Sequence, residues 1–338
     1  MDFATSERRG LSTKRFGALV ISLCLLISAR NAAAQTPPAT ASSAPSPASG
    51  LWLLQINQYR KLAGLDPVRE SGAMSAGDLN HAKYLVKNFE TDLSAGADTH
   101  AEKRDNPSYT ASGAAAALLS NVAVRTGSDQ SADPDAETTQ VIDDWMTEPF
   151  QRLGILDPDL REVGLGTYRD GTYFAVVLQI RKAPPQEGAV PAVGGLGEYL
   201  DDHWPPKQSA KYPIMFPPDG SQISMRVYEG GEWPDPMAPC GAIGSAGLPI
   251  TLELGPDVQT GAIASHLLTA DGEPVRHCVF DASTYAAPDM NQAMLGKENL
   301  EAFGAVVLIP RAPLRVGTTY TVSIAMNGKE YKWSFSVK

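Results

Sequence analysis

Cysteine, histidine and known catalytic motifs are all scarce in this sequence of 338 residues. Only three cysteines and five histidines occur. There is no HExxH, CxxC or GxSxG motif and no glycine-rich phosphate loop, so the usual signatures of zinc proteases, dithiol oxidoreductases, serine hydrolases and nucleotide-binding proteins are missing. Function must therefore be inferred from the order and spacing of residues, because no single catalytic motif indicates it.

The sequence also lacks an excess of positive charge. Its 28 Lys and Arg against 38 Asp and Glu give a net charge of −10. Residues 1–34 hold five basic and two acidic side chains, a net +3, so the remainder carries −13. Such an acidic protein is a poor electrostatic partner for nucleic acid or an anionic membrane surface. We expect no nucleic-acid partner.

One apolar run stands out, at residues 16–29 near the N-terminus. It follows four basic residues within the first 15 positions and precedes three consecutive alanines that end at Ala34. This pattern predicts a secretory signal peptide, residues 1–34, cleaved between Ala34 and Gln35. The run is short for a permanent span, which needs about 20 residues. We predict an extracytoplasmic protein, periplasmic or secreted, with no stable membrane span after cleavage; the alternative is a retained N-terminal anchor.

Cysteine usage is compatible with export. Cleavage removes Cys24 and leaves Cys240 and Cys278, both in one predicted domain. In an exported protein such a pair predicts a disulfide. The alternative is two separate buried thiols.

Composition divides the rest of the chain into two predicted domains. Residues 35–50, mostly Pro, Ala, Ser and Thr, predict a flexible tether. Residues 51–182 form the first domain, and a Pro- and Gly-rich linker spans residues 183–212. In residues 213–338 the apolar stretches predict about seven short strands. They end in an Asn-Gly hairpin, which is typical of an all-β, immunoglobulin-like sandwich.

Hydrophobic periodicity predicts mixed helices and strands in the first domain. Helices are expected at residues 51–62, about 71–89 and about 138–146. Two apolar strands, residues 163–168 and 173–180, flank a turn and predict a hairpin. The fold class is therefore α+β.

Five short motifs occur in residues 51–182 in a characteristic order. They are Ile56-Asn57-x-x-Arg60, Leu79-x-His81-Ala82, Thr99-His100-x-Glu102, Trp145-Met146-x-x-Pro149-Phe150-Gln151-Arg152 and Val163-Gly164-x-Gly166. The ordered series resembles the CAP superfamily, also called SCP/TAPS, in its bacterial secreted form. The resemblance implies a CAP-type α-β-α sandwich with a cleft on one face, followed here by a region similar to bacterial Ig-like domains.

In that family the cleft commonly holds two histidines and two acids, which together can bind a divalent metal. The resemblance aligns His100 with the first histidine, Gln151 with the second, and Ser120-Asn121 with the family's Glu-Asn pair. Glu102 is a candidate for a surviving acid. An amide is a weak ligand and no general base near neutral pH. We therefore expect these five residues to line a polar ligand cleft without a cofactor, with His100 as the remaining metal candidate.

Three functions follow from this resemblance. The first is a non-catalytic exported protein whose cleft binds a small or lipid-like ligand, or a cell-envelope partner. The second is a metal-assisted or histidine-dependent hydrolase, a peptidase or cell-wall hydrolase, with His100 and Glu102 as catalytic residues. The third is a structural envelope protein. A fold shared by many functions does not decide between them.

Other residues are expected to have structural roles. His81 and Trp145 lie at helical spacing and predict packing in the core. His266 and His277 are expected on strands of the second domain, where a hairpin would place them across from each other. A two-histidine metal site and a surface or packing role both remain open there. The hydroxyl of Tyr320 is expected to tie a loop to nearby backbone, as tyrosines do in Ig-like domains.

Overall fold

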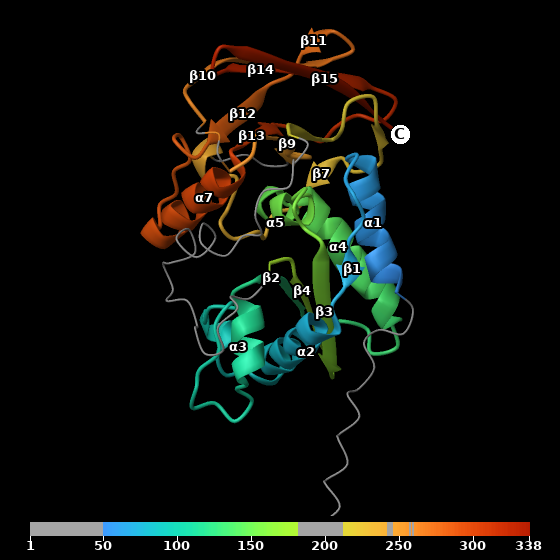
Figure 1. Cartoon of the computed structure of the whole chain (residues 1–338), viewed down its shortest axis with the longest axis vertical. Helices are drawn as coiled ribbons and strands as arrows, with labels where there is room; N and C mark the ends of the chain where they lie inside the picture. The colour runs from blue at the N-terminus through green and yellow to red at the C-terminus, as the bar shows by residue number, and fades with distance from the viewer. Residues whose placement is uncertain (1–49, 182–211, 242–245, 257, 259) are drawn as a thin grey trace, which may run out of the picture. The chain divides into compact units, whose positions relative to one another are not determined.

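The computed structural model describes residues 50–181, 212–241, 246–256, 258 and 260–338 (Figure 1). All of them fall within a single structural unit that spans residues 43–338. The predicted signal peptide lies outside the described residues, as do the tether and the linker except for one terminal residue of each. Among the helices that the structure describes, none is long and apolar enough to cross a membrane.

Helices and strands alternate in the first half of the described chain. They are α1 (Leu51–Leu62), β1 (Arg69–Glu70), α2 (Gly72–Lys87), η1 (Leu93–Ala95), α3 (Ala111–Ala117), β2 (Ser120–Arg125), α4 (Pro134–Thr147), α5 (Pro149–Ile155), β3 (Glu162–Asp170) and β4 (Tyr173–Gln179). The three predicted helices and the predicted hairpin are confirmed. Helix α4 begins earlier than periodicity indicates, because Asp133 caps it through Asp135 N and Pro134 occupies its first turn.

Four strands form one sheet in the order β1-β3-β4-β2. Alternate residues of β4 point to opposite faces. Ala175 and Val177 pack with Leu85 of α2, whereas Val176 and Leu178 belong to the cluster that contains α1 and α4. Helices α2 and α3 therefore lie on one side of the sheet, and α1, α4 and α5 on the other (Figure 1). This is the predicted α-β-α sandwich.

Two glycines bring α2 close to β3. A Cβ on Gly166 would lie 2.0 Å from the backbone nitrogen of Leu79. A Cβ on Gly164 would lie 2.4 Å from Asp78 Oδ2. The Gly-x-Gly motif is thus required by close packing between a helix and a strand.

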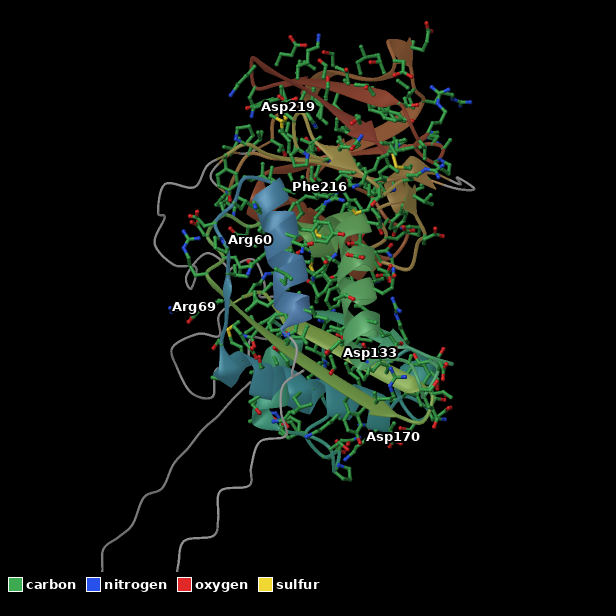
Figure 2. The ribbon with its side chains drawn as sticks, turned by 90° about the vertical axis from the view of Figure 1, so that its right-hand side faces the viewer. Arg60, Arg69, Asp133, Asp170, Phe216 and Asp219 are labelled. Atoms are coloured by element: carbon green, nitrogen blue, oxygen red, sulfur yellow. A yellow bond between two sulfur atoms is a disulfide. The ribbon has the colours of Figure 1, made fainter. Side chains whose placement is uncertain are left out.

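Arg60 fixes the end of α1 to the segment after α5 (Figure 2). Its side chain is completely buried, and its Nη1 donates to the carbonyl oxygens of Ile155 and Asp157, both at 2.8 Å. Its Nε donates to Asp66 O at 2.9 Å. A guanidinium has five donors, so one buried arginine satisfies carbonyl groups in two separate loops.

The second half of the described chain is rich in strands. They are β5 (Ile214–Phe216), β6 (Gln222–Ile223), β7 (Val227–Tyr228), β8 (Ala246–Gly247), β9 (Ile250–Glu253), β10 (Ile263–Ala270), β11 (Glu273–Pro274), β12 (His277–Asp281), β13 (Ala305–Pro310), β14 (Thr319–Met326) and β15 (Lys329–Val337), with the helices η2 (Ala238–Cys240) and α7 (Met290–Phe303). The sheet orders are β11-β10-β14-β15-β6, β12-β13-β9-β5 and β7-β8.

This region is rich in strands as predicted, but it has eleven short strands among the described residues instead of about seven, and one helix that was not predicted. The hairpin β14–β15 turns at Asn327–Gly328, as the Asn-Gly signal predicts. Helix α7 was not expected, because every apolar stretch here was interpreted as a strand. Tyr320 behaves as predicted, since its hydroxyl accepts a hydrogen bond from Arg315 N at 2.8 Å. The β-rich architecture is compatible with an Ig-like sandwich.

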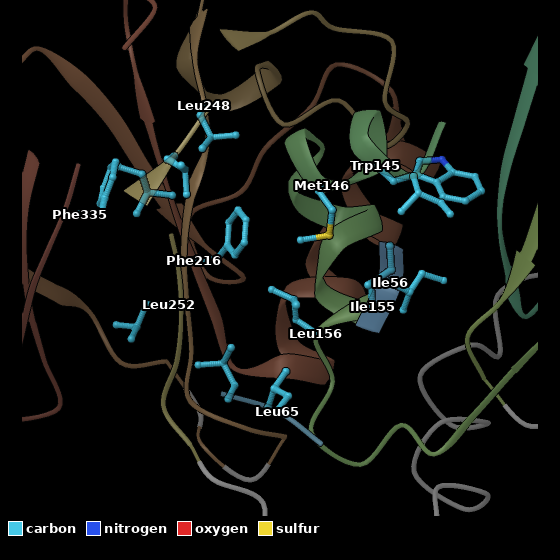
Figure 3. Packing of buried hydrophobic residues seen from close by; sticks show 14 of the residues in the cluster. Ile56, Leu65, Trp145, Met146, Ile155, Leu156, Phe216, Leu248, Leu252 and Phe335 are labelled. Atoms are coloured by element: carbon cyan, nitrogen blue, oxygen red, sulfur yellow. The ribbon is translucent and has the colours of Figure 1, made fainter. Parts of the chain in front are cut away.

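Buried apolar side chains from both halves belong to one cluster (Figure 3). Met146 and Leu156 come from the first half, and Phe216 and Phe335 from the second. Trp145 lies in the same cluster with 2% exposure, so its predicted core role is confirmed. The predicted disulfide Cys240–Cys278 is also formed, with a Cα–Cα distance of 5.6 Å.

Candidate functional site

His100 lies in the loop between η1 and α3 and is half-buried. Its Nδ1 lies 2.8 Å from Ala117 O at the end of α3. A carbonyl only accepts, so Nδ1 must carry the proton. Burial lowers the pKa of the imidazole, which keeps the ring neutral near pH 7. Nε2 is then a lone pair, and no hydrogen bond to it is found among the described residues.

Glu102 forms a buried pair with His81 of α2. Glu102 Oε1 lies 2.9 Å from His81 Nδ1, and both side chains have no exposed area. His81 Nε2 lies 2.8 Å from Thr99 O. The two ring nitrogens therefore contact the Glu102 carboxyl and a backbone carbonyl, so both are used in hydrogen bonds inside the protein. The second carboxylate oxygen, Oε2, accepts from Thr110 N at 3.0 Å.

Ser120 joins the C-terminal end of α3 to α2. Its hydroxyl lies 2.7 Å from Ala116 O and 3.1 Å from Asp78 Oδ1. Burial raises the pKa of Asp78 well above its usual range, because its carboxyl has no exposure to water. A protonated Asp78 can donate to Ser120 Oγ while the Ser120 hydroxyl donates to Ala116 O. Every hydrogen-bonding group of Ser120 is thus used inside the protein.

Asn121 and Gln151 are neighbours. Asn121 is buried at the start of β2, and its Nδ2 donates to Gln151 O at 3.0 Å. Gln151 N, in the first turn of α5, donates to Glu232 Oε1 at 2.8 Å. The backbone of Gln151 is therefore held on both sides, and the residue as a whole is half-buried.

The side-chain carboxyl group of Glu232, from the β-rich half of the chain, accepts a hydrogen bond from the first turn of α5. This turn has backbone N–H groups without helical partners, and the N-cap residue Glu148 makes no side-chain cap. Burial and the nearby Glu148 raise the pKa of Glu232 well above its usual range. Burial, followed by repulsion from Asp144, raises the pKa of Glu148 to about 7. Two carboxyls that resist ionisation therefore lie beside Gln151.

The predicted cleft residues fall into two groups. Glu102, Ser120 and Asn121 have buried side chains that bond to other protein groups. His100 and Gln151 are half-buried residues, and among the described residues no hydrogen bond is found to His100 Nε2 or to the side-chain amide of Gln151. Among the residues that the structure describes, no three His, Cys, Asp or Glu side chains are placed to hold a metal ion together. The chemistry that these two residues offer is one neutral imidazole lone pair and one side-chain amide.

Sequence reasoning missed three residues that build the site. His81 was expected only to pack, yet it carries the charge partner of Glu102. Asp78 lies one turn before it on α2 and holds Ser120. Glu232 lies 81 residues beyond Gln151. For His81 and Asp78 the sequence held a usable signal, because both are polar residues on the side of α2 that is buried. The sequence near Glu232 holds no comparable signal.

Comparison with known families gives one match. The model of the Cysteine-rich secretory protein family (CAP) matches residues 53–180, which contain all five predicted cleft residues. No curated protein matches the chain.

Proposed function

Residues 53–180 are a CAP domain, and from this premise we propose that the protein is an exported, non-catalytic CAP protein that binds a small or lipid-like ligand, or a cell-envelope partner, at His100 and Gln151. The disulfide Cys240–Cys278 supports the proposed export, because structural disulfides persist in oxidising compartments.

The observation that carries the proposal is the state of Glu102. Its side chain has no exposed area, Oε1 pairs with His81 and Oε2 accepts from Thr110 N. A general base must accept a proton from water or substrate, so it needs a free oxygen within reach of either. Glu102 has none. Its use is structural, because it holds the loop that carries His100 against α2.

The same pattern supports ligand contact at His100 and Gln151. Both residues are half-buried, whereas Ser120 and Asn121 are buried and bond to other protein groups. A neutral imidazole and an amide provide donors and acceptors without a net charge. Such a surface suits an uncharged polar group on an otherwise apolar molecule.

Ligand capture tests this proposal. The purified protein is incubated with a small-molecule and lipid extract of its native compartment, and co-eluting compounds are identified by mass spectrometry. We expect a compound that the wild type retains and that His100→Ala and Gln151→Ala each retain about tenfold less, since a buried ligand hydrogen bond contributes about 1–1.5 kcal/mol. The matched control is Asn106→Ala, which lies in the same part of the chain but outside this pair.

Two outcomes would overturn the proposal. One is that no compound is enriched over the control. The other is that the two site variants retain the compound as well as the wild type does. In the second case the ligand binds elsewhere on the protein, and the site loses its assigned role.

A further inference from the structure

His266 and His277 form a pair outside the CAP domain. His266 Nδ1 lies 2.8 Å from His277 Nε2, and the two rings are nearly perpendicular, at 78°. His266 is on β10 and His277 begins β12. The turn between them pairs Thr269 with Pro274, and Val275 N donates to Leu268 O, so the same register places the two histidines opposite each other.

The hydrogen bonds of His277 fix where its lone pair lies. Its Nδ1 is 2.7 Å from Val275 O, so this nitrogen carries a proton. Nε2 of His277 is then a lone pair that accepts from His266 Nδ1–H. A backbone carbonyl that orients an imidazole in this way is the usual support of a metal-binding histidine.

The distance between the two nitrogens fits one coordination geometry better than another. With metal–nitrogen bonds of about 2.0–2.1 Å, two ligands at about 90° lie about 2.9 Å apart, while a tetrahedral angle separates them by about 3.4 Å. The observed 2.8 Å is close to the first value. An angle of about 90° occurs in square-planar and octahedral sites, which Cu²⁺ and Ni²⁺ adopt, and N/O/S sites in general bind Cu²⁺ more tightly than Ni²⁺ or Zn²⁺. The two nitrogens now share a hydrogen bond, so both rings must turn slightly for their lone pairs to point to one ion.

We propose that His266 and His277 form a solvent-accessible two-histidine site for a divalent transition-metal ion, with Cu²⁺ bound more tightly than Zn²⁺. Nδ1 of His266 and Nε2 of His277 are the ligands. For binding, the proton of His266 moves from Nδ1 to Nε2 through solvent, so a neutral pair releases no net proton. His266 is exposed, which gives the ion a path of entry.

The site has a rigid base and open coordination positions. Cys278, next to His277, is held by the disulfide to Cys240, and β12 pairs with β13 from His277 onwards. Among the described residues no third His, Cys, Asp or Glu joins the pair in a metal-binding group. Water or a second ligand therefore completes the coordination shell.

Calorimetric titration of the protein with Cu²⁺ and with Zn²⁺ tests the proposal. We expect one Cu²⁺ per chain, a weaker Zn²⁺ affinity, and a loss of at least about tenfold in Cu²⁺ affinity in His266→Ala and in His277→Ala. The control is Ser265→Ala, an exposed neighbour on β10 that leaves both rings in place. His266→Asn and His277→Gln repeat the test with polar side chains if an alanine variant unfolds.

Nitrogen NMR of the histidine rings gives a second readout that does not depend on affinity. Without metal, both His266 and His277 should be protonated at Nδ1. Zn²⁺ should shift the resonances of His266 Nδ1 and His277 Nε2 together. Affinity for Cu²⁺ that stays within about twofold of wild type in both histidine variants, or a wild type that binds no Cu²⁺, would overturn the assignment.

Discussion

Glu102 shows at the scale of a residue how an acid in a CAP domain can be engaged by hydrogen bonds of the protein itself. The carboxylate stabilises His81 and the backbone of Thr110, and it is shielded from water on all sides. Removing one partner of such a buried pair destabilises the protein strongly, because the other partner then remains buried without its hydrogen bond.

Glu102→Ala is therefore expected to destabilise the protein by about 2–4 kcal/mol. The variant leaves His81 Nδ1 and Thr110 N without an acceptor. Equilibrium unfolding in urea measures the change in free energy. Asp105→Ala, an exposed carboxylate in the same loop, is the matched control and should change stability by less than about 0.5 kcal/mol. Equal effects in the two variants would contradict the structural role given to Glu102.

The sequence allowed the residues near the site to be found but not their pairing. His100, Ser120, Asn121 and Gln151 follow from the order of family motifs. The His81–Glu102 pair spans 21 residues and has no spacing rule, since a loop of that length can fold in many ways. The path of that loop decides whether the acid of a family motif faces a ligand or forms hydrogen bonds within the protein.

At the scale of elements, the contact between α2 and β3 fixes the position of α2, which carries two residues of the site. Helix α2 carries Asp78 and His81. Strand β3 can pack this closely against α2 only because Gly164 and Gly166 have no side chain. The backbone nitrogen of Leu79 occupies the space that a Cβ on Gly166 would need.

Gly166→Ala should consequently cost at least about 3 kcal/mol, because the added methyl meets backbone that cannot move without shifting the helix. Gly72→Ala is the control, since a Cβ there has no neighbour within 4 Å. Gly72 lies at the start of α2, where alanine should be neutral or slightly stabilising. Thermal and urea unfolding of both variants measure the difference. A Gly166→Ala protein as stable as Gly72→Ala would show that α2 does not pack on β3 this closely.

The start of α5 gives a prediction about pH. The pKa of Glu148 is raised from 4.5 to about 7, mainly by burial. A carboxyl whose pKa is higher in the folded state favours folding while it is protonated, and that contribution is lost as the pH rises from about 4.5 through 7. Glu148→Gln removes the ionisation. We expect the variant to be more stable than wild type by about 1 kcal/mol at pH 8, allowing for solvent screening, and not at pH 4.

Urea unfolding at a series of pH values measures this effect. Glu301→Gln, an exposed substitution on α7, is the control and should parallel the wild type. A wild-type stability that does not fall between pH 5 and pH 7.5 relative to Glu148→Gln would contradict it.

Helix α7 marks the limit of element prediction. Only Gly296, Leu300 and Phe303 of its 14 residues are buried, and Met290 is 86% exposed, so its hydrophobic periodicity is weak. The usable signal was the cap. Asp289 accepts from Gln292 N, and an acid or hydroxyl residue followed three positions later by Gln or Glu is a helix-start pattern. The hairpin β14–β15, where buried and less buried residues alternate along β14, was predicted at its position, whereas the short strands β5, β8 and β11 were not predicted.

At the scale of the whole molecule, long-range links join segments far apart in sequence. Arg152 of α5 donates to Met146 O at 2.7 Å and to Pro249 O at 2.9 Å. Its guanidinium also lies 4.5 Å from the ring centroid of Phe216. Links of this kind follow from tertiary packing, so composition and local pattern do not reveal them.

The disulfide is the one long-range link that sequence did predict. It closes a loop with a separation of 38 residues, and the chain-entropy estimate for that length is about 4 kcal/mol. The double variant Cys240→Ala/Cys278→Ala should lose stability of that order in urea unfolding. Reductant should lower the stability of the wild type towards that of the variant and leave the variant unchanged. A wild type that does not respond to reductant under unfolding conditions would contradict a stabilising bridge.

Binding without turnover is the central claim for the whole protein, and one time course tests it most directly. The compound captured from the native extract is incubated with an equimolar amount of protein, and its mass and its bound fraction are followed. The account predicts that the compound stays bound with an unchanged mass throughout. A product that forms with wild type, and that His100→Ala does not form, would contradict it.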